Sequence, residues 1–129
     1  MSVITKTDAS AKGILIVEDN SLLSLVYEMQ IQKLGHHILA NVTSGEMAID
    51  AVKDLNPDLV IMDIYLDGDI DGIEAMEKIR EFSRVPVIYI SCNSDAYHSQ
   101  RVRKTNYIDF LIKPVNNRKI LHTLRRALN

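Results

Sequence analysis

The feature that most limits the fold of this chain is a run of four apolar residues, 59–62, that ends at an aspartate, Asp63. A run without polar alternation is typical of a strand that is buried on both faces, as in a parallel sheet. Open parallel sheets bind ligands outside the carboxyl ends of their strands, so Asp63 is expected to face a crevice that water reaches. Because an unpaired buried carboxylate is costly, this position favours chemistry or cation binding, with a turn or a helix cap as the alternative.

Strand patterns and helical patterns alternate along the chain. Four further strands are predicted at residues 14–17, 37–42, 87–90 and 107–112. Helices are predicted between and after them, the first with an inward-facing stripe. The apolar residues at helical spacing are Leu22, Leu25, Val26 and Met29; Ala48, Ala51, Val52 and Leu55; Ala75, Met76 and Ile79; and Leu121, Leu124 and Leu128. This alternation predicts an α/β fold, with helices on both faces of a five-stranded parallel sheet and right-handed crossovers.

Two segments lack such patterning. Residues 95–104 can be helical but offer almost no apolar stripe, so we expect a lightly anchored, mobile helix there. Residues 1–12 are polar and non-periodic, and we expect a disordered arm or the remnant of a longer chain. The chain of 129 residues has the size of one domain, which we place at residues 13–129.

Composition and charge exclude several classes of protein. With 47% hydrophobic and 25% charged residues and no apolar run near ~20 residues, the chain has the makeup of a soluble protein without a membrane span. The single cysteine, Cys92, cannot form an internal disulfide and no secretion signal is visible, so we expect a cytoplasmic location. A net charge of -2 argues against direct nucleic-acid binding, which normally goes with a basic excess.

Polar residues follow four of the five predicted strands. They are Glu18 and Asp19 after the first strand, Asp63 after the third, Ser91 after the fourth and Lys113 after the fifth. The carboxyl ends of parallel strands share one edge of the sheet, so these side chains are expected to form one site. Three acids close together repel one another, and a hard divalent cation, Mg²⁺ or Mn²⁺, would relieve that repulsion.

This set of groups is suited to phosphoryl transfer. With the cation bound, Asp63 could act as a nucleophile towards a phosphoryl group and form an acyl phosphate. Lys113 could place a positive charge on a phosphoryl oxygen, and Ser91 could donate a hydrogen bond.

Five motifs together resemble the receiver domain of two-component response regulators. They are ILIVEDN at residues 14–20, LVIMD at 59–63, DGIEA at 71–75, VIYIS at 87–91 and FLIKPV at 110–115. The resemblance covers residues 14–128 and implies a doubly wound, flavodoxin-like fold with strand order 2-1-3-4-5. It also implies a cis bond between Lys113 and Pro114.

The same resemblance implies a role for each site residue. Asp63 would be the phosphoacceptor, while Ser91 and Lys113 would engage the phosphoryl group. Mg²⁺ would be held by Glu18, Asp19, Asp63 and the backbone carbonyl of Tyr65. The donor would be a phosphohistidine on a sensor histidine kinase or a phosphotransfer protein. Ser91 would couple to the aromatic Phe110 as a switch, and a homodimer is possible.

The chain also departs from the usual receiver pattern. Ser91 replaces the commoner threonine, Cys92 stands where a small residue is frequent, and the loop after Asp63 lacks the usual Pro-Gly pair. A receiver-like binding module that is never phosphorylated therefore stays open as an alternative. An aspartyl-phosphate phosphatase or phosphotransferase would need a second acid at position 65, where this chain has Tyr65.

Two other types of ligand site fit the sequence poorly. Residues 67–72 begin like a calcium-binding loop, but Lys78 stands where the twelfth, bidentate acid would be needed. A nucleotide- or flavin-binding domain would need a Gly- or Ser/Thr-rich loop after the first strand. Basic residues gather late in the chain, either as a solvated face or as part of a docking surface: Arg101, Arg103, Lys104, Arg118, Lys119, Arg125 and Arg126.

Overall fold

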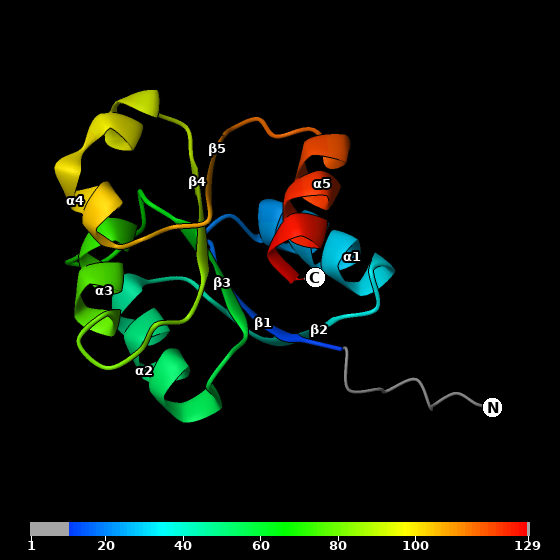
Figure 1. The fold of residues 1–129 in the computed structure, drawn as a ribbon, viewed down its shortest axis with the longest axis horizontal. Helices are drawn as coiled ribbons and strands as arrows, with labels where there is room; N and C mark the ends of the chain where they lie inside the picture. Colours follow the sequence, from blue (N-terminus) through cyan, green and yellow to red (C-terminus); the bar gives the residue numbers. More distant parts are fainter. Residues whose placement is uncertain (1–10, 129) are drawn as a thin grey trace.

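A computed structural model describes residues 11–128 of the chain, so the arm predicted at residues 1–12 lies almost wholly outside the described residues. These residues form a parallel sheet with strand order β2-β1-β3-β4-β5, which confirms the predicted fold class (Figure 1). The strands are β1 (Gly13–Val17), β2 (His37–Val42), β3 (Leu59–Asp63), β4 (Val87–Ser91) and β5 (Asp109–Ile112). The helices are α1 (Ser21–Lys33), α2 (Gly45–Leu55), α3 (Gly72–Ile79), α4 (Gln100–Lys104) and α5 (Asn117–Leu128), with a 3₁₀ helix, η2 (Ser94–His98), before α4.

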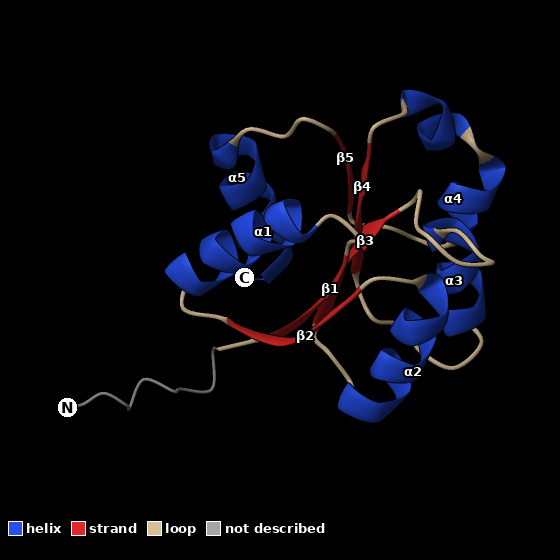
Figure 2. Cartoon of the chain, turned by 180° about the vertical axis from the view of Figure 1, so that it is seen from behind, coloured by secondary structure: helices blue, strands red, loops and turns tan. Residues whose placement is uncertain are grey.

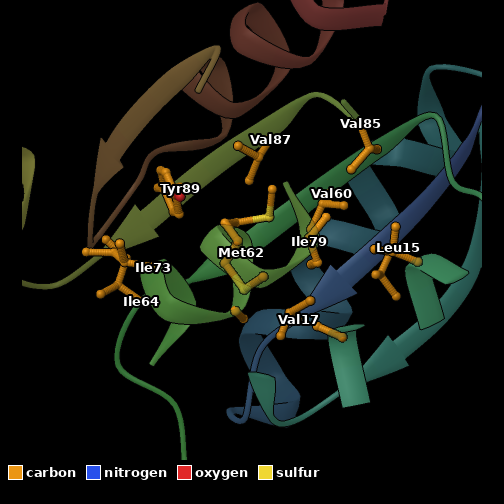
Figure 3. Close-up of a cluster of buried hydrophobic side chains, with 14 of the residues drawn as sticks. Leu15, Val17, Val60, Met62, Ile64, Ile73, Ile79, Val85, Val87 and Tyr89 are labelled. Atoms are coloured by element: carbon orange, nitrogen blue, oxygen red, sulfur yellow. The ribbon is translucent and has the colours of Figure 1, made fainter. Parts of the chain in front are cut away.

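The helices form two layers around the sheet. Helices α1 and α5 cover one face, and α2, α3 and α4 cover the other (Figure 2). Successive residues of β1, β3 and β4 point to opposite faces, so the all-apolar runs supply two separate cores. Figure 3 shows the core beneath α2 and α3, in which Val17, Met62 and Tyr89 of three neighbouring strands meet. The unalternating patterns of these strands are therefore explained by burial on both sides.

The predicted inward stripe of α1 is wrong. Leu22, Leu25 and Met29 are 68%, 50% and 59% exposed, and Val26 is only half-buried. The helix instead turns its other apolar residues to the sheet, with Tyr27 and Ile31 in the core. This helix carries two apolar stripes at the same helical spacing, so periodicity alone could not show which one is buried.

The stripes of the other helices were predicted more accurately. All three residues predicted to form the apolar stripe of α3 are buried, as are Ala48, Ala51 and Val52 of α2. Leu55 is 42% exposed, because it is the last residue of α2 and extends beyond the sheet. In α5, Leu124 and Leu128 are buried and Leu121 is half-buried.

Residues 95–104 do not form the single helix that we predicted. Ser99 has an extended backbone and separates η2 from α4, where its side chain caps the first turn of α4. Only Ala96 and Val102 of this segment are buried, in agreement with its weak apolar stripe. The mobility of the segment stays a prediction. Strand β5 begins at Asp109, two residues later than predicted.

None of the helices within residues 11–128 has the length and apolar character that a bilayer span requires.

Candidate functional site

The strand order brings the predicted site residues to one edge of the sheet. Strands β1, β3, β4 and β5 are consecutive neighbours, and each presents its polar residue at or just after its last position. Backbone hydrogen bonds hold two of these positions in place. The Glu18 N–H donates to the Val42 carbonyl at 3.0 Å, and the Lys113 N–H donates to the Ser91 carbonyl at 2.8 Å. The Lys113–Pro114 bond is cis, as the resemblance implied.

Three carboxylates lie together at this edge. Glu18, Asp19 and Asp63 each offer an oxygen, and these oxygens all lie within 4.8 Å of one another. Glu18 and Asp63 are 3% and 4% exposed, so water screens their mutual repulsion weakly. Asp19 is the most exposed of the three acids. Such a set of hard oxygen ligands, open to solvent on one side, suits Mg²⁺ or Mn²⁺, which keep several waters when bound.

Lys113 partly balances these acids. Its Nζ lies 3.1 Å from Asp63 Oδ2 and 3.1 Å from Glu18 Oε1. Burial acts to lower the pKa of Lys113, but the hydrogen bonds and charges of the two acids outweigh burial and raise the pKa above its ordinary value. Lys113 is therefore a fixed positive charge that touches two carboxylates from different strands.

The charged form of Glu18 is destabilised in spite of its contact with Lys113. Burial and then the nearby Asp63 carboxylate raise the pKa of Glu18 to about 7, although the Asn20 N–H and Lys113 oppose this. The Asn20 N–H donates to Oε2 at 3.1 Å. Within residues 11–128, Oε1 is buried and has no hydrogen bond of good geometry besides its ion-pair contact with Lys113. A cation bound between the acids would stabilise the charged form of Glu18, so the residues fit a divalent metal.

Hydrogen bonds tie both ends of the loop after β3 to the end of that strand, one to Asp63 and one to Ile64. The Tyr65 N–H donates to Asp63 Oδ1 at 3.3 Å, while the predicted use of the Tyr65 carbonyl as a metal ligand stays a prediction. The Gly72 N–H donates to the Ile64 carbonyl at 2.8 Å, which draws the start of α3 against the end of β3. A Cβ at Gly72 would lie only 2.2 Å from the Asp63 carbonyl oxygen. Gly72 was not among the predicted site residues. The sequence feature that could have indicated its role is the Asp71-Gly72 pair at the start of an apolar helix.

Ser91 ends β4, the strand next to the one that ends at Asp63, and Phe110 lies in β5. Ser91 is fully buried, and its Oγ accepts a hydrogen bond from the Asn93 N–H at 3.2 Å. Phe110 is 8% exposed and packs against Tyr97, with ring centroids 5.4 Å apart. Phe110, the aromatic residue predicted to act in the switch, therefore lies in the core under η2, and its switch role stays a prediction.

Tyr27 is a buried polar neighbour of the site that sequence reasoning missed. Burial, followed by the charges of Glu18 and Asp63 and a hydrogen bond with Glu18, raises the pKa of its hydroxyl. With Cys92, Lys113 and Pro114 it also lines a cavity of about 370 Å³. An aromatic residue inside a helix is most often core, and only the fold brings this one close to Glu18.

A model of the response regulator receiver domain matches residues 14–125. The chain belongs to the receiver domain family. This establishes the resemblance seen in the five motifs.

Relatives of known name agree with this assignment. The chain is 29% identical to the chemotaxis protein CheY of Bacillus subtilis, over 92% of this chain and 99% of CheY. It is 28% identical to the transcriptional regulatory protein AfsQ1 of Streptomyces coelicolor, over 90% of this chain, and spans about half (51%) of the length of AfsQ1. Among solved structures, the signal receiver domain of a modulated diguanylate cyclase from Desulfovibrio desulfuricans is 31% identical, with a TM-score of 0.81 over 92% of this chain and 94% of that one.

Proposed function

We propose that this receiver domain is a signalling switch that accepts a phosphoryl group on Asp63 from a phosphohistidine, with Mg²⁺ bound. The donor would be a sensor histidine kinase or a phosphotransfer protein. The observation that carries the proposal is the contact of Lys113 Nζ with both Asp63 and Glu18 at 3.1 Å, in a site where a third acid also offers an oxygen. Membership of the receiver family supports it.

The residues divide the reaction between them. A carboxylate oxygen of Asp63 attacks the phosphorus, the bond from phosphorus to the histidine nitrogen breaks, and the histidine leaves with the electron pair of that bond. Lys113 balances charge on the transferred group from the side of β5. Glu18, Asp19 and Asp63, with the Tyr65 carbonyl, would hold the Mg²⁺. When bound, that ion supplies charge neutralisation and orients the phosphoryl oxygens.

The phosphoryl group would change the protein through Ser91. The group carries about -1.5 to -2 charge and strong acceptor oxygens, which would draw the Ser91 hydroxyl away from its contact with the Asn93 N–H. Phe110 packs beside this loop and would follow, which shifts η2 and α4. Shifting the equilibrium between the unphosphorylated and phosphorylated conformations from 1:99 to 99:1 needs about 5.5 kcal/mol. A few charge-assisted hydrogen bonds supply this free energy only in good geometry.

Three further expectations belong to this proposal. The receiver domain spans residues 13–129, the protein acts in the cytoplasm where a kinase reaches it, and the switch alters binding to a partner or to a second copy. The domain is a phosphoacceptor, with at most catalysis of its own phosphorylation and dephosphorylation.

A mass measurement tests the proposal. The protein is incubated with acetyl phosphate and Mg²⁺, and we expect the wild type to gain the mass of one phosphoryl group while Asp63→Asn does not. Asp54→Asn, which makes the same chemical change on the exposed side of α2, is the control and should still be modified. An unmodified wild type that still binds Mg²⁺ would favour the binding module, and sustained hydrolysis of an external phosphoester would favour the phosphatase.

A further inference from the structure

A cavity of about 370 Å³ lies beside the acidic site, between α1 and the start of α5. The two helices pack side by side on one face of the sheet (Figure 2). Most of the residues that line this α1–α5 cavity are apolar or aromatic, from α1 on one side and from the first turn of α5 and the loop before it on the other: Leu23, Val26, Tyr27, Pro114, Val115 and Ile120. The proposed phosphorylation uses none of these residues, so it does not account for the cavity.

The size and lining of the α1–α5 cavity are those of a small-molecule site. Ligand pockets have volumes of about 300 to 1,000 Å³ and are lined mostly by apolar and aromatic side chains, with a few polar groups. An apolar cavity of about 150 Å³ is large enough for benzene. The larger volume here gives room for a molecule with two fused rings. Tyr27 and Ile120 are each 3% exposed and belong to the same core, so packing holds two of the walls in place.

The charges around the cavity select an uncharged ligand. Lys113 is the one charged residue among the described residues that line it, and its Nζ is already held 3.1 Å from both Glu18 and Asp63. An anionic group would find no free cation there and would be repelled by the carboxylates of the acidic site. A cationic group would lose its water without gaining an acidic partner, because the described lining holds no Asp or Glu.

We propose that the α1–α5 cavity binds a compact, uncharged molecule with a two-ring aromatic body. The ring of Tyr27 provides an aromatic wall against which such a body packs edge-on or offset. Binding needs neither Mg²⁺ nor a phosphoryl group. Asp63→Asn should therefore bind the molecule as the wild type does, so a failure of phosphorylation and a failure of this binding are distinguishable.

Indole is the probe, and its binding is followed by amide NMR. We expect saturable shifts at the residues of the α1–α5 cavity. Indoleacetamide and indoleacetate test the selection by charge, because they have nearly the same shape and differ in charge. The uncharged amide should bind at least about tenfold more tightly than the carboxylate. A wild type that does not bind indole, or equal binding of amide and carboxylate, would overturn the proposal.

A pair of tryptophan variants tests the place of binding. Val26→Trp fills the cavity from α1 and should weaken indole binding at least about tenfold. Ile49→Trp enlarges another half-buried helical residue, on α2, and should leave the affinity within about twofold of wild type. Equal affinities of the two variants would refute the assignment. So would a dimer that only Val26→Trp dissociates, because a second copy would then occupy the cavity.

The single cysteine of the chain supplies a test that needs no variant of the cavity. The exposed Cys92 lines the cavity, so bound indole should cover part of its side chain and slow its alkylation by iodoacetamide severalfold. Cys92→Ser should keep its affinity for indole in the NMR titration, because the binding is not covalent. An alkylation rate that saturating indole leaves unchanged would place indole elsewhere and contradict the proposal.

Discussion

Replacing Gly72 with alanine should damage both the fold and the acidic site proposed to bind Mg²⁺. The new Cβ would lie 2.2 Å from the Asp63 carbonyl oxygen, 2.9 Å from Met62 Cγ and 3.0 Å from Ile64 Cα. Ordinary contact begins near 3.4 Å, so α3 and the end of β3 must separate by about 1 Å. Two of the three obstructing atoms belong to the backbone, so a change of side-chain rotamer cannot relieve the clash.

The size of the effect follows from two opposing contributions. Overpacking of this kind costs about 1 to 3 kcal/mol, and the rigid backbone places Gly72→Ala near the upper end. Replacing glycine by alanine in a helix returns roughly 0.5 to 1 kcal/mol. The net loss is about 2 kcal/mol in the free energy of unfolding, which lowers the urea midpoint by about 1 M.

Gly45 provides a matched control. It is the first residue of α2, as Gly72 is the first residue of α3, and each follows a capping side chain. A Cβ at Gly45 would meet Ile70 Cγ1 at 2.7 Å, but Ile70 is a half-buried loop residue whose side chain can rotate. Gly45→Ala should therefore stay within about 1 kcal/mol of wild type.

Urea unfolding and Mg²⁺ titration of the two variants provide the test. We expect Gly72→Ala alone to lose stability and to bind Mg²⁺ more weakly, because the carbonyl it displaces belongs to Asp63. If Gly72→Ala and Gly45→Ala had the same midpoint and the same Mg²⁺ affinity as wild type, the close approach of α3 to β3 would be refuted.

Three other perturbations have defined outcomes. Because the pKa of Glu18 is about 7 and a proton competes with a cation for its oxygens, Mg²⁺ should bind about tenfold more weakly at pH 6 than at pH 8, as measured by calorimetry; a flat profile would contradict this. Lys113→Met leaves Glu18 and Asp63 facing each other, so it should lose about 1 to 3 kcal/mol of stability without Mg²⁺ and recover most of it when Mg²⁺ is added. Unfolding that does not respond to Mg²⁺ would show that charge is not the cause. On α1, Ile31→Ala should lower the free energy of unfolding by about 2 to 5 kcal/mol, and Leu25→Ser by less than about 0.5 kcal/mol, as measured by denaturant unfolding. A larger loss for Leu25→Ser than for Ile31→Ala would support the stripe predicted from sequence.

The strands and the site could be predicted because each rests on an unambiguous pattern. An apolar run of four or five residues can be buried on both faces only in the middle of a layered sheet, and the residue that ends it must then lie at the sheet's edge. Glu18, Asp63 and Lys113 were found in this way, without any knowledge of the helices. Their roles in phosphorylation stay predictions.

The structural predictions were wrong or incomplete where two arrangements satisfy the same sequence pattern. Helix α1 has one stripe with Leu22 and Leu25 and another with Tyr27 and Ile31, and only contact with the sheet decides between them. Residues 95–104 are divided at Ser99, whose extended backbone and capping side chain start α4; a serine occurs both inside helices and at their starts, so the sequence alone left the break open. Gly72 and Tyr27 matter through approaches to β3 and Glu18, which become visible only when distant segments are folded together.

The acidic site contains three carboxylates and one ammonium, that of Lys113, and this balance of charge determines which ions suit the site. With all four groups ionised, the site has a net charge of two negative units. One divalent ion makes the site neutral, whereas a monovalent ion leaves it negatively charged. A phosphoryl group on Asp63 carries about -1.5 to -2 charge in place of the single negative charge of the carboxylate, so the site with its ion bound would become negative again. The ion should therefore bind more tightly once Asp63 is phosphorylated, and by linkage its presence should shift the phosphorylation equilibrium towards the modified aspartate by the same factor.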